Sequence, residues 1–315
     1  MIPGSHAPAH ASPRSSPSLR HPGYIVLVPA HRRHHPLAPA AFLAPAALVL
    51  GVFFAGSLAQ VTYLSFTRYT AFSGPDWVGF DNYTRLLSSG RFWGALFNSA
   101  VYLLVTPAII VLSLLAALAV DVRLRGMSWL RLALFLPVVT PTIVAALMWR
   151  LLYNEDSGVL NAGLRWLWLD GVPWLTERPW TLIAAALVTL WKGFGFYMMV
   201  FLAALASVPR ELREAATLDG ASRRQVFWNV TFPSIRPAIA LVFVISSISA
   251  LKVFEELFVT IKGAPISHQT VVPLIYQVAF EEGNYGMASA IGITLFFIIL
   301  AFSIVQLKLT SRTEP

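Results

Sequence analysis

The sequence predicts an all-α membrane protein with six transmembrane helices. Of its 315 residues, 57% are hydrophobic and only 12% are charged, which is roughly half the charged fraction of a typical soluble domain. Several apolar runs also reach the length of about 20 residues that a helix needs to cross a bilayer. This composition excludes an ordinary cytosolic enzyme. The lack of cysteine excludes disulfides, cysteine-ligated metals and thiol catalysis.

The N-terminal segment, residues 1–36, differs from the rest of the chain. It is rich in Pro, Ser, His and Arg and has too few apolar residues to form a core. We predict a disordered cytoplasmic tail, in which the scattered histidines are more often incidental than metal ligands. The apolar run that follows is too long for a secretion signal and lacks a small-residue cleavage site, so we expect a retained span.

Six apolar runs predict the transmembrane helices, and the third contains Pro137 and Pro141. Proline removes a backbone donor, so we expect this helix to be kinked. Together the six runs predict one membrane domain, residues 37–308, followed by a short cytoplasmic tail, 309–315. The spans are expected at about 40–63, 95–120, 130–153, 182–206, 238–259 and 285–307.

The distribution of basic residues predicts the orientation. If the N-terminus is cytoplasmic, the cytoplasmic segments hold about twice as many Lys and Arg residues as the outer segments. Lys192 and Lys252 lie inside predicted spans and are left out of this comparison. Because cytoplasmic loops carry an excess of Lys and Arg, we expect both termini in the cytoplasm.

The cytoplasmic segment between spans four and five contains two helix-start signals. Ser207 can cap a helix that Pro209 opens. Ser222 and Gln225 have the spacing of a capping box, and Gly220 between the two signals permits a sharp turn. The pattern predicts a helix, a bend and a second helix. Their mixed apolar and charged side chains suit docking into a groove on a soluble partner; the alternative is an amphipathic connector on the lipid surface.

This segment resembles the EAA loop of permease subunits in binding-protein-dependent ABC importers. The resemblance places the EAA loop at residues 207–237 and implies that it contacts an ATPase, with Glu214 making a polar contact and Gly220 providing the bend. The matching residues are Glu214, Ala215, Ala216, Asp219, Gly220, Ala221, Phe227 and Pro233.

Other segments are similar to the carbohydrate-uptake branch of the same family. These are Trp77–Tyr83 followed by Phe92 and Trp93, Leu136-Pro137 with Trp149, Lys252–Phe254, and Tyr285–Ala290. One segment departs from the family pattern, because Ile261–Pro265 replaces a Thr and a Gly-Gly-Pro turn. The departure implies that a binding protein docks differently on this loop.

The resemblance implies the fold of a type I ABC importer permease in a bacterial inner membrane. It also implies a second permease subunit as a heterodimer partner, two ABC ATPase subunits and an extracytoplasmic solute-binding protein. The sequence has no GxxxxGK[ST] motif, so ATP-Mg is expected on the partner ATPase and no cofactor on this chain. The implied cargo is a sugar or a sugar-like solute.

Polar side chains within the spans are candidates for the solute pathway, because charge at membrane depth is costly unless it faces protein or water. In span five, four polar residues fall within about 120° of arc at 100° per residue, and the last two could form an ion pair. Equally, the serines could simply permit close helix packing and the ion pair could be structural. The candidates are Ser246, Ser249, Lys252 and Glu256, with the aromatic residues Trp191, Phe194 and Tyr197 of span four.

Other functional classes are less consistent with the sequence. It contains no HExxH or GxSxG motif, and we expect neither a catalytic nor a metal site. Its basic residues flank membrane spans instead of lining one face, which argues against nucleic-acid binding. The remaining alternative is a secondary transporter or channel that works alone in the lipid bilayer.

Overall fold

A computed structural model describes residues 37–122, 124–261 and 265–311. The chain divides into two units, residues 1–53 and 54–315, and each is described separately. The tail predicted for residues 1–36 lies outside the described residues, as do Lys262, Gly263 and Ala264 of the departing loop and the last four residues. The first unit contains α1 (Leu37–Leu50), and the π-helical segment η1 (Gly51–Gly56) includes the boundary between the two units.

The second unit is helical apart from one small hairpin. Its elements are α2 (Ser57–Ser65), β1 (Thr67–Thr70), β2 (Ser73–Trp77), α3 (Asp81–Ser88), α4 (Gly90–Tyr102), α5 (Val105–Val120), α6 (Met127–Val139), α7 (Thr142–Leu152), α8 (Val159–Trp166), α9 (Trp180–Ser207), α10 (Arg210–Leu218), α11 (Arg223–Val226), η2 (Phe227–Thr231), α12 (Phe232–Leu251), α13 (Glu255–Thr260), η3 (Ile266–His268), α14 (Val271–Tyr276), η4 (Gln277–Glu281) and α15 (Tyr285–Ser311).

The prediction of six apolar transmembrane helices is confirmed. In the described part of the chain, five helices are long and apolar enough to cross a membrane, and the bent pair α6 and α7, counted as one span, brings the number to six. This pair is bent by 95° at Thr140 and Pro141, so the predicted kink is a full break of the helix. Pro137 remains inside α6.

Span five is shorter than predicted. The helix ends at Leu251, and residues 252–254 leave the helical conformation before α13 begins at Glu255. The continuous helix expected through Val259 is therefore wrong. A lysine in an apolar run is costly at membrane depth, and the break leaves Lys252 exposed while Val253 is buried.

The main core lies where α5, α6 and α12 pack on α9. Its buried side chains include Tyr102, Met198, Phe201 and Ile235. Gly195 permits the close approach of α6, because a β-carbon there would lie 2.4 Å from the Leu134 carbonyl oxygen. Many large apolar side chains remain exposed on the outer helix faces, as expected of surfaces that lie in lipid.

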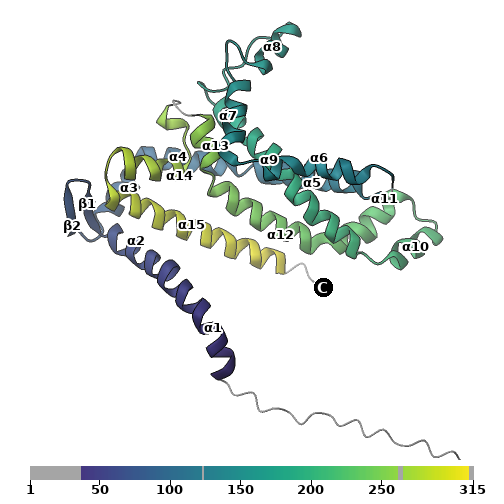
Figure 1. Cartoon of the computed structure of the whole chain (residues 1–315), viewed down its shortest axis with the longest axis horizontal. Coiled ribbons are helices and arrows are strands. Elements are labelled where there is room, and N and C mark those ends of the chain that lie inside the picture. The colour runs from purple at the N-terminus through teal and green to yellow at the C-terminus, as the bar shows by residue number, and fades with distance from the viewer. Residues whose placement is uncertain (1–36, 123, 262–264, 312–315) are drawn as a thin grey trace, which may run out of the picture. The chain divides into compact units, whose positions relative to one another are not determined.

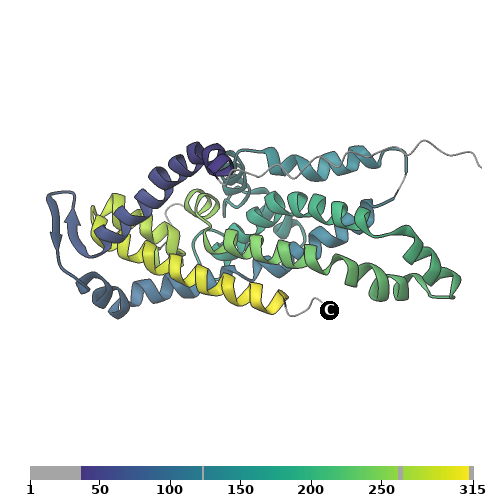
Figure 2. The same ribbon diagram turned by 90° about the horizontal axis from the view of Figure 1, so that it is seen from below.

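The hairpin β1–β2 and the pair α10–α11 lie at opposite ends of the second unit (Figures 1 and 2). The hairpin is antiparallel, with Thr67 opposite Trp77. On the far side of the unit, α9 ends and α12 begins next to α10 and α11. This arrangement is the one expected if the two regions lie on opposite sides of a membrane.

Buried polar contacts hold the loop that follows α13. Asn98 of α4 donates from Nδ2 to the carbonyl oxygens of Ser267 and Gln269, both at 2.8 Å. Its Oδ1 accepts a hydrogen bond from Arg178. His268 lies between Ser267 and Gln269 in the sequence, and its Nδ1 is 3.4 Å from the Thr181 hydroxyl.

Candidate functional site

The segment 207–237, called the coupling loop below, has the helix–bend–helix form that the sequence predicts. α10 ends at Leu218, and Gly220, two residues further on, has a φ of +84°. The Gly220 amide donates to the Thr217 carbonyl at 3.1 Å, and the Ala221 amide donates to the Ala216 carbonyl at 3.0 Å. These two bonds form a Schellman motif, which requires a left-handed residue and so favours glycine.

One of the two predicted caps forms and the other does not. Ser222 and Gln225 make a reciprocal capping box at the start of α11. Ser207, in contrast, is the last residue of α9, and its hydroxyl donates to the Ala204 carbonyl at 2.7 Å. The predicted Ser207 cap is therefore wrong: α9 continues through Ser207, and α10 begins at Arg210 without a side-chain cap.

Arg213 attaches α10 to the end of α9. Its Nη2 donates to the Val208 carbonyl at 3.2 Å and to the Leu205 carbonyl at 3.5 Å. These carbonyls lie at the C-terminal end of α9, where backbone carbonyl groups have no N–H partner within the helix. The same guanidinium borders a cavity of about 210 Å³, which also contacts Leu118 and Asp121 at the end of α5. The coupling loop is thus anchored to the end of α9 and faces the end of α5 across this cavity.

The outer face of α10 is open to solvent, since α10 has no buried residue. Leu212 is 52% exposed and Leu218 is 89% exposed. Apolar side chains displayed next to charged ones on a well-anchored helix are typical of a docking surface. Of the eight residues that match the EAA motif, Glu214, Ala215, Asp219 and Gly220 are exposed, and Ala216, Ala221, Phe227 and Pro233 are half-buried.

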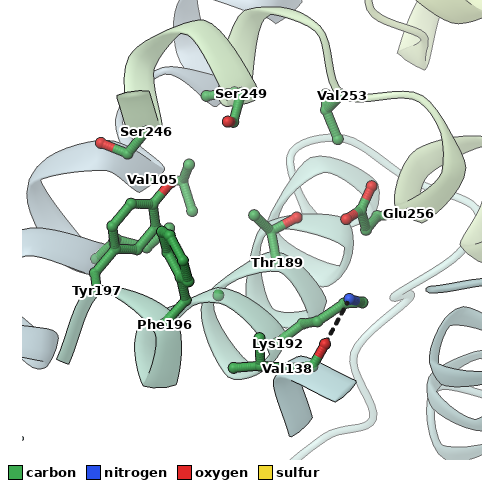
Figure 3. A pocket seen from close by; sticks show the side chains of 13 residues that line it. Val105, Val138, Thr189, Lys192, Phe196, Tyr197, Ser246, Ser249, Val253 and Glu256 are labelled. Carbon is green, nitrogen blue, oxygen red and sulfur yellow. Dashed lines mark hydrogen bonds between the residues drawn. The ribbon is translucent and has the colours of Figure 1, made fainter. Parts of the chain in front are cut away.

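A cavity of about 200 Å³ lies between α9 and α12, closed by α5, the end of α6 and the start of α13. Figure 3 shows its polar side chains. Four of the seven predicted pathway residues line it, namely Tyr197, Ser246, Ser249 and Glu256.

The other three predicted pathway residues do not line this cavity. Trp191 packs edge-on against Trp149, with ring centroids 5.8 Å apart. Phe194 is not among the lining residues, and its backbone carbonyl accepts from the Ser113 hydroxyl at 3.0 Å. Lys252 lies past the end of α12, so the predicted pair with Glu256 is not among the ion pairs of the described residues.

Lys192 is the lining residue that the sequence reasoning overlooked as a site residue. Together with Thr189 and Phe196 it forms one face of α9. Its ammonium lies 3.5 Å from the Val138 carbonyl, at the point where α6 breaks. Its position in a predicted span could have identified it, because a lysine within a membrane span is by itself a candidate functional residue.

The cavity combines groups that can bind a hydroxylated molecule. Lys192 and Glu256 point into the same space from different elements (Figure 3). The Ser246 and Ser249 hydroxyls donate within their own helix, at 2.6 and 2.9 Å, and keep acceptor capacity on the cavity side. Phe196 adds an aromatic face. Hydrogen bonds from charged groups together with an aromatic surface suit sugar hydroxyls and the apolar face of a sugar ring.

Comparisons with known proteins identify the family of the chain. The model of the family "Binding-protein-dependent transport system inner membrane component" matches residues 87–314. The multiple sugar-binding transport system permease protein MsmF of Streptococcus mutans is 32% identical, covering 84% of this chain and 91% of its own. The arabinooligosaccharides transport system permease protein AraP of Halalkalibacterium halodurans is 37% identical over 80% of each chain.

A solved structure has the same fold. A chain of a bacterial ABC transporter involved in the import of the acidic polysaccharide alginate superposes with a TM-score of 0.78 at 25% identity, covering 87% of this chain and 95% of that one. With the coupling loop, the six apolar spans and these matches in agreement, the chain belongs to the family of inner membrane components of binding-protein-dependent transport systems.

Proposed function

We propose that this chain forms half of the translocation pathway of an ATP-driven importer for a sugar or a sugar-like solute. A separate ATPase binds the coupling loop and drives transport. The observation that carries this proposal is the exposed and anchored α10 in a permease-family chain that lacks a phosphate-binding loop of its own. The sugar class is supported by the names of the relatives, which are permeases for multiple sugars and arabinooligosaccharides.

The coupling loop is linked to the cavity by one continuous helix. This helix runs from Arg223 to Leu251 and carries Ser246 and Ser249 near its far end. The rise of 1.5 Å per residue places Ser246 about 35 Å from Arg223 along the helix axis. Closure of an ATPase pair on α10 and α11 would tilt this helix as a rigid element and change the cavity between inward-open and outward-open states.

In the proposed pathway the solute occupies the cavity between α9 and α12. Sugar hydroxyls would replace the Val138 carbonyl as acceptors for the Lys192 ammonium and would donate to the Glu256 carboxylate. Charge-assisted hydrogen bonds of this kind are the stronger ones. Opening of the cavity removes these bonds and so releases the solute.

The proposed partners are a second permease subunit, two ABC ATPase subunits carrying ATP-Mg and an extracytoplasmic solute-binding protein. The family description, which names dependence on a binding protein, supports the last of these. We place both termini in the cytoplasm of a bacterial cell. With α10–α11 in the cytoplasm, the position of the β1–β2 hairpin at the opposite end of the second unit (Figure 1) supports placing the hairpin on the outer side.

Co-purification of the ATPase tests the proposal. We expect Glu214→Lys to release the ATPase from detergent-purified complex, because it reverses an exposed charge on α10, while the membrane subunits stay folded. The matched control is Glu281→Lys, the same change on an exposed residue far from the coupling loop. If Glu214→Lys and the control retain equal amounts of ATPase, the assignment of α10 to the ATPase contact is wrong.

A further inference from the structure

A second cavity lies beside α12, at the end where the last residues of the coupling loop form the first turns of this helix. It measures about 560 Å³ and runs along α12 between Phe232 and Phe243, with the end of α15 at Leu309 and Thr310 as one wall. The eleven steps from Phe232 to Phe243 correspond to about 16 Å of helix. The floor is apolar and includes Pro237 and Ala240. This groove is elongated along α12 and mainly apolar.

Arg236 is the only charged residue among the described side chains that line the groove. It is exposed, and its guanidinium carbon lies 5.9 Å from the centroid of the Phe232 ring. The ion pairs found among the described residues do not include it. An arginine held over an aromatic ring and without a carboxylate partner presents its donors to an outside anion.

The aromatic residues around Arg236 indicate the depth at which it lies. Trp228 and Phe232 precede it at intervals of four residues, and their ring centroids are 5.0 Å apart. Trp228 is 52% exposed. Exposed tryptophan next to an arginine at the end of an apolar span is typical of the membrane–water interface. The guanidinium therefore lies at headgroup level, with the apolar groove extending from it along α12.

We propose that this groove binds an anionic phospholipid. Arg236 donates to the phosphate, and one acyl chain lies along Pro237, Ala240 and Phe243. The guanidinium fork matches the geometry of phosphate oxygens. The charge complementarity favours an anionic headgroup over a zwitterionic one, since basic pockets between membrane helices on the cytoplasmic side bind such headgroups.

The position of this lipid gives it a mechanical role. α12 belongs to the continuous helix Arg223–Leu251 that joins the coupling loop to the solute cavity. A lipid bound at Arg236 would bridge α12 and the end of α15. It would therefore stabilise this part of the helix without contacting the solute.

Lipid retention measured by native mass spectrometry tests the proposal. The full permease complex is exchanged into vesicles of equal parts phosphatidylglycerol and phosphatidylcholine and then extracted in mild detergent. We expect Arg236→Gln to lower the retained ratio of phosphatidylglycerol to phosphatidylcholine about fivefold, the effect of one basic residue near an anionic headgroup. Arg125→Gln is the matched control, because it removes the same charge from an exposed residue between α5 and α6, outside both the groove and the coupling loop.

A steric variant tests the acyl-chain part separately. Ala240→Phe fills the groove and leaves Arg236 in place, so it should reduce retention of both lipids. Equal phosphatidylglycerol retention by the wild type and Arg236→Gln would overturn the proposal. It would also be overturned if cysteines at Ala240 and on a facing helix of the second permease subunit formed a disulfide, because the groove would then be a subunit interface. This chain has no native cysteine to interfere.

Discussion

The coupling loop and the solute cavity are organised in different ways. The coupling loop takes its shape from contacts between residues close in sequence, such as the Gly220 turn and the Ser222–Gln225 capping box. The cavity is assembled from five elements whose lining residues run from Val105 to Glu256. We infer that local variants should disable coupling while leaving the membrane domain folded. Variants in the helix packing should affect stability and transport together.

The largest expected effect is at Gly220. Its φ of +84° is incompatible with proline, so Gly220→Pro should abolish ATPase co-purification without unfolding the spans. Gly220→Asn is the matched control, because asparagine tolerates the left-handed region. Thermal unfolding of both variants checks that the membrane domain is intact. If the proline variant retained the ATPase like the asparagine variant, the bend would not matter for docking.

The second expected effect is a difference in sugar uptake between variants of Lys192 and Lys252, the two lysines of the predicted spans. Lys192→Met should lower the rate of sugar uptake about tenfold or more, because hydrogen bonds to charged groups contribute about 1.5–3 kcal/mol. Lys252→Met should change it little, since Lys252 lies outside the cavity. Uptake into vesicles by the complete transporter measures both. Equal losses would argue against the cavity as the pathway.

The third expected effect concerns the packing beneath the cavity. A β-carbon at Gly195 would lie 2.4 Å from the Leu134 carbonyl oxygen, whereas at Gly193 its nearest neighbour is the Ile109 Cδ1 at 3.7 Å. Gly195→Ala should therefore lower the free energy of unfolding by about 1–3 kcal/mol. Gly193→Ala should be nearly neutral. Similar unfolding midpoints for the two variants would contradict the close approach of α6 and α9.

The smallest expected effect is a dependence of stability on pH at His268, which belongs to neither region. Burial, and then the nearby Arg178 guanidinium, hold the pKa of His268 below its ordinary value. The unfolded chain then binds a proton more readily than the folded chain, so stability is present above the unfolded pKa of about 6.5 and falls as pH drops below it. His268→Gln should flatten the change in unfolding midpoint between pH 8 and pH 5.5. An unchanged pH profile in this variant would exclude His268 as the cause.

The sequence alone predicts those parts of the fold that depend on interactions between residues close in the chain. The six spans follow from run length, and the helix–bend–helix form follows from Gly220, Ser222 and Gln225. The break at residues 252–254 was missed because it depends on where Lys252 and Val253 lie relative to the packed helices.

The cavity could be predicted only in part. Ser246, Ser249 and Glu256 were found from their helical spacing, although the helix does not continue through Glu256. Trp191 and Phe194 lie close in sequence to Lys192 but do not line the cavity, because the rotation of α9 is set by its packing on α5 and α12. One residue along a helix turns a side chain by about 100°, so a partner helix is needed to decide which residue faces inward.

The central claim is that a separate ATPase drives this chain through the coupling loop. The most direct measurement is sugar uptake into vesicles that contain the complete transporter, with its binding protein outside, in the presence and absence of ATP-Mg within. We expect uptake only with ATP-Mg, and its loss in Gly220→Pro. Equal uptake by vesicles that contain this chain alone, without nucleotide or ATPase, would contradict the account.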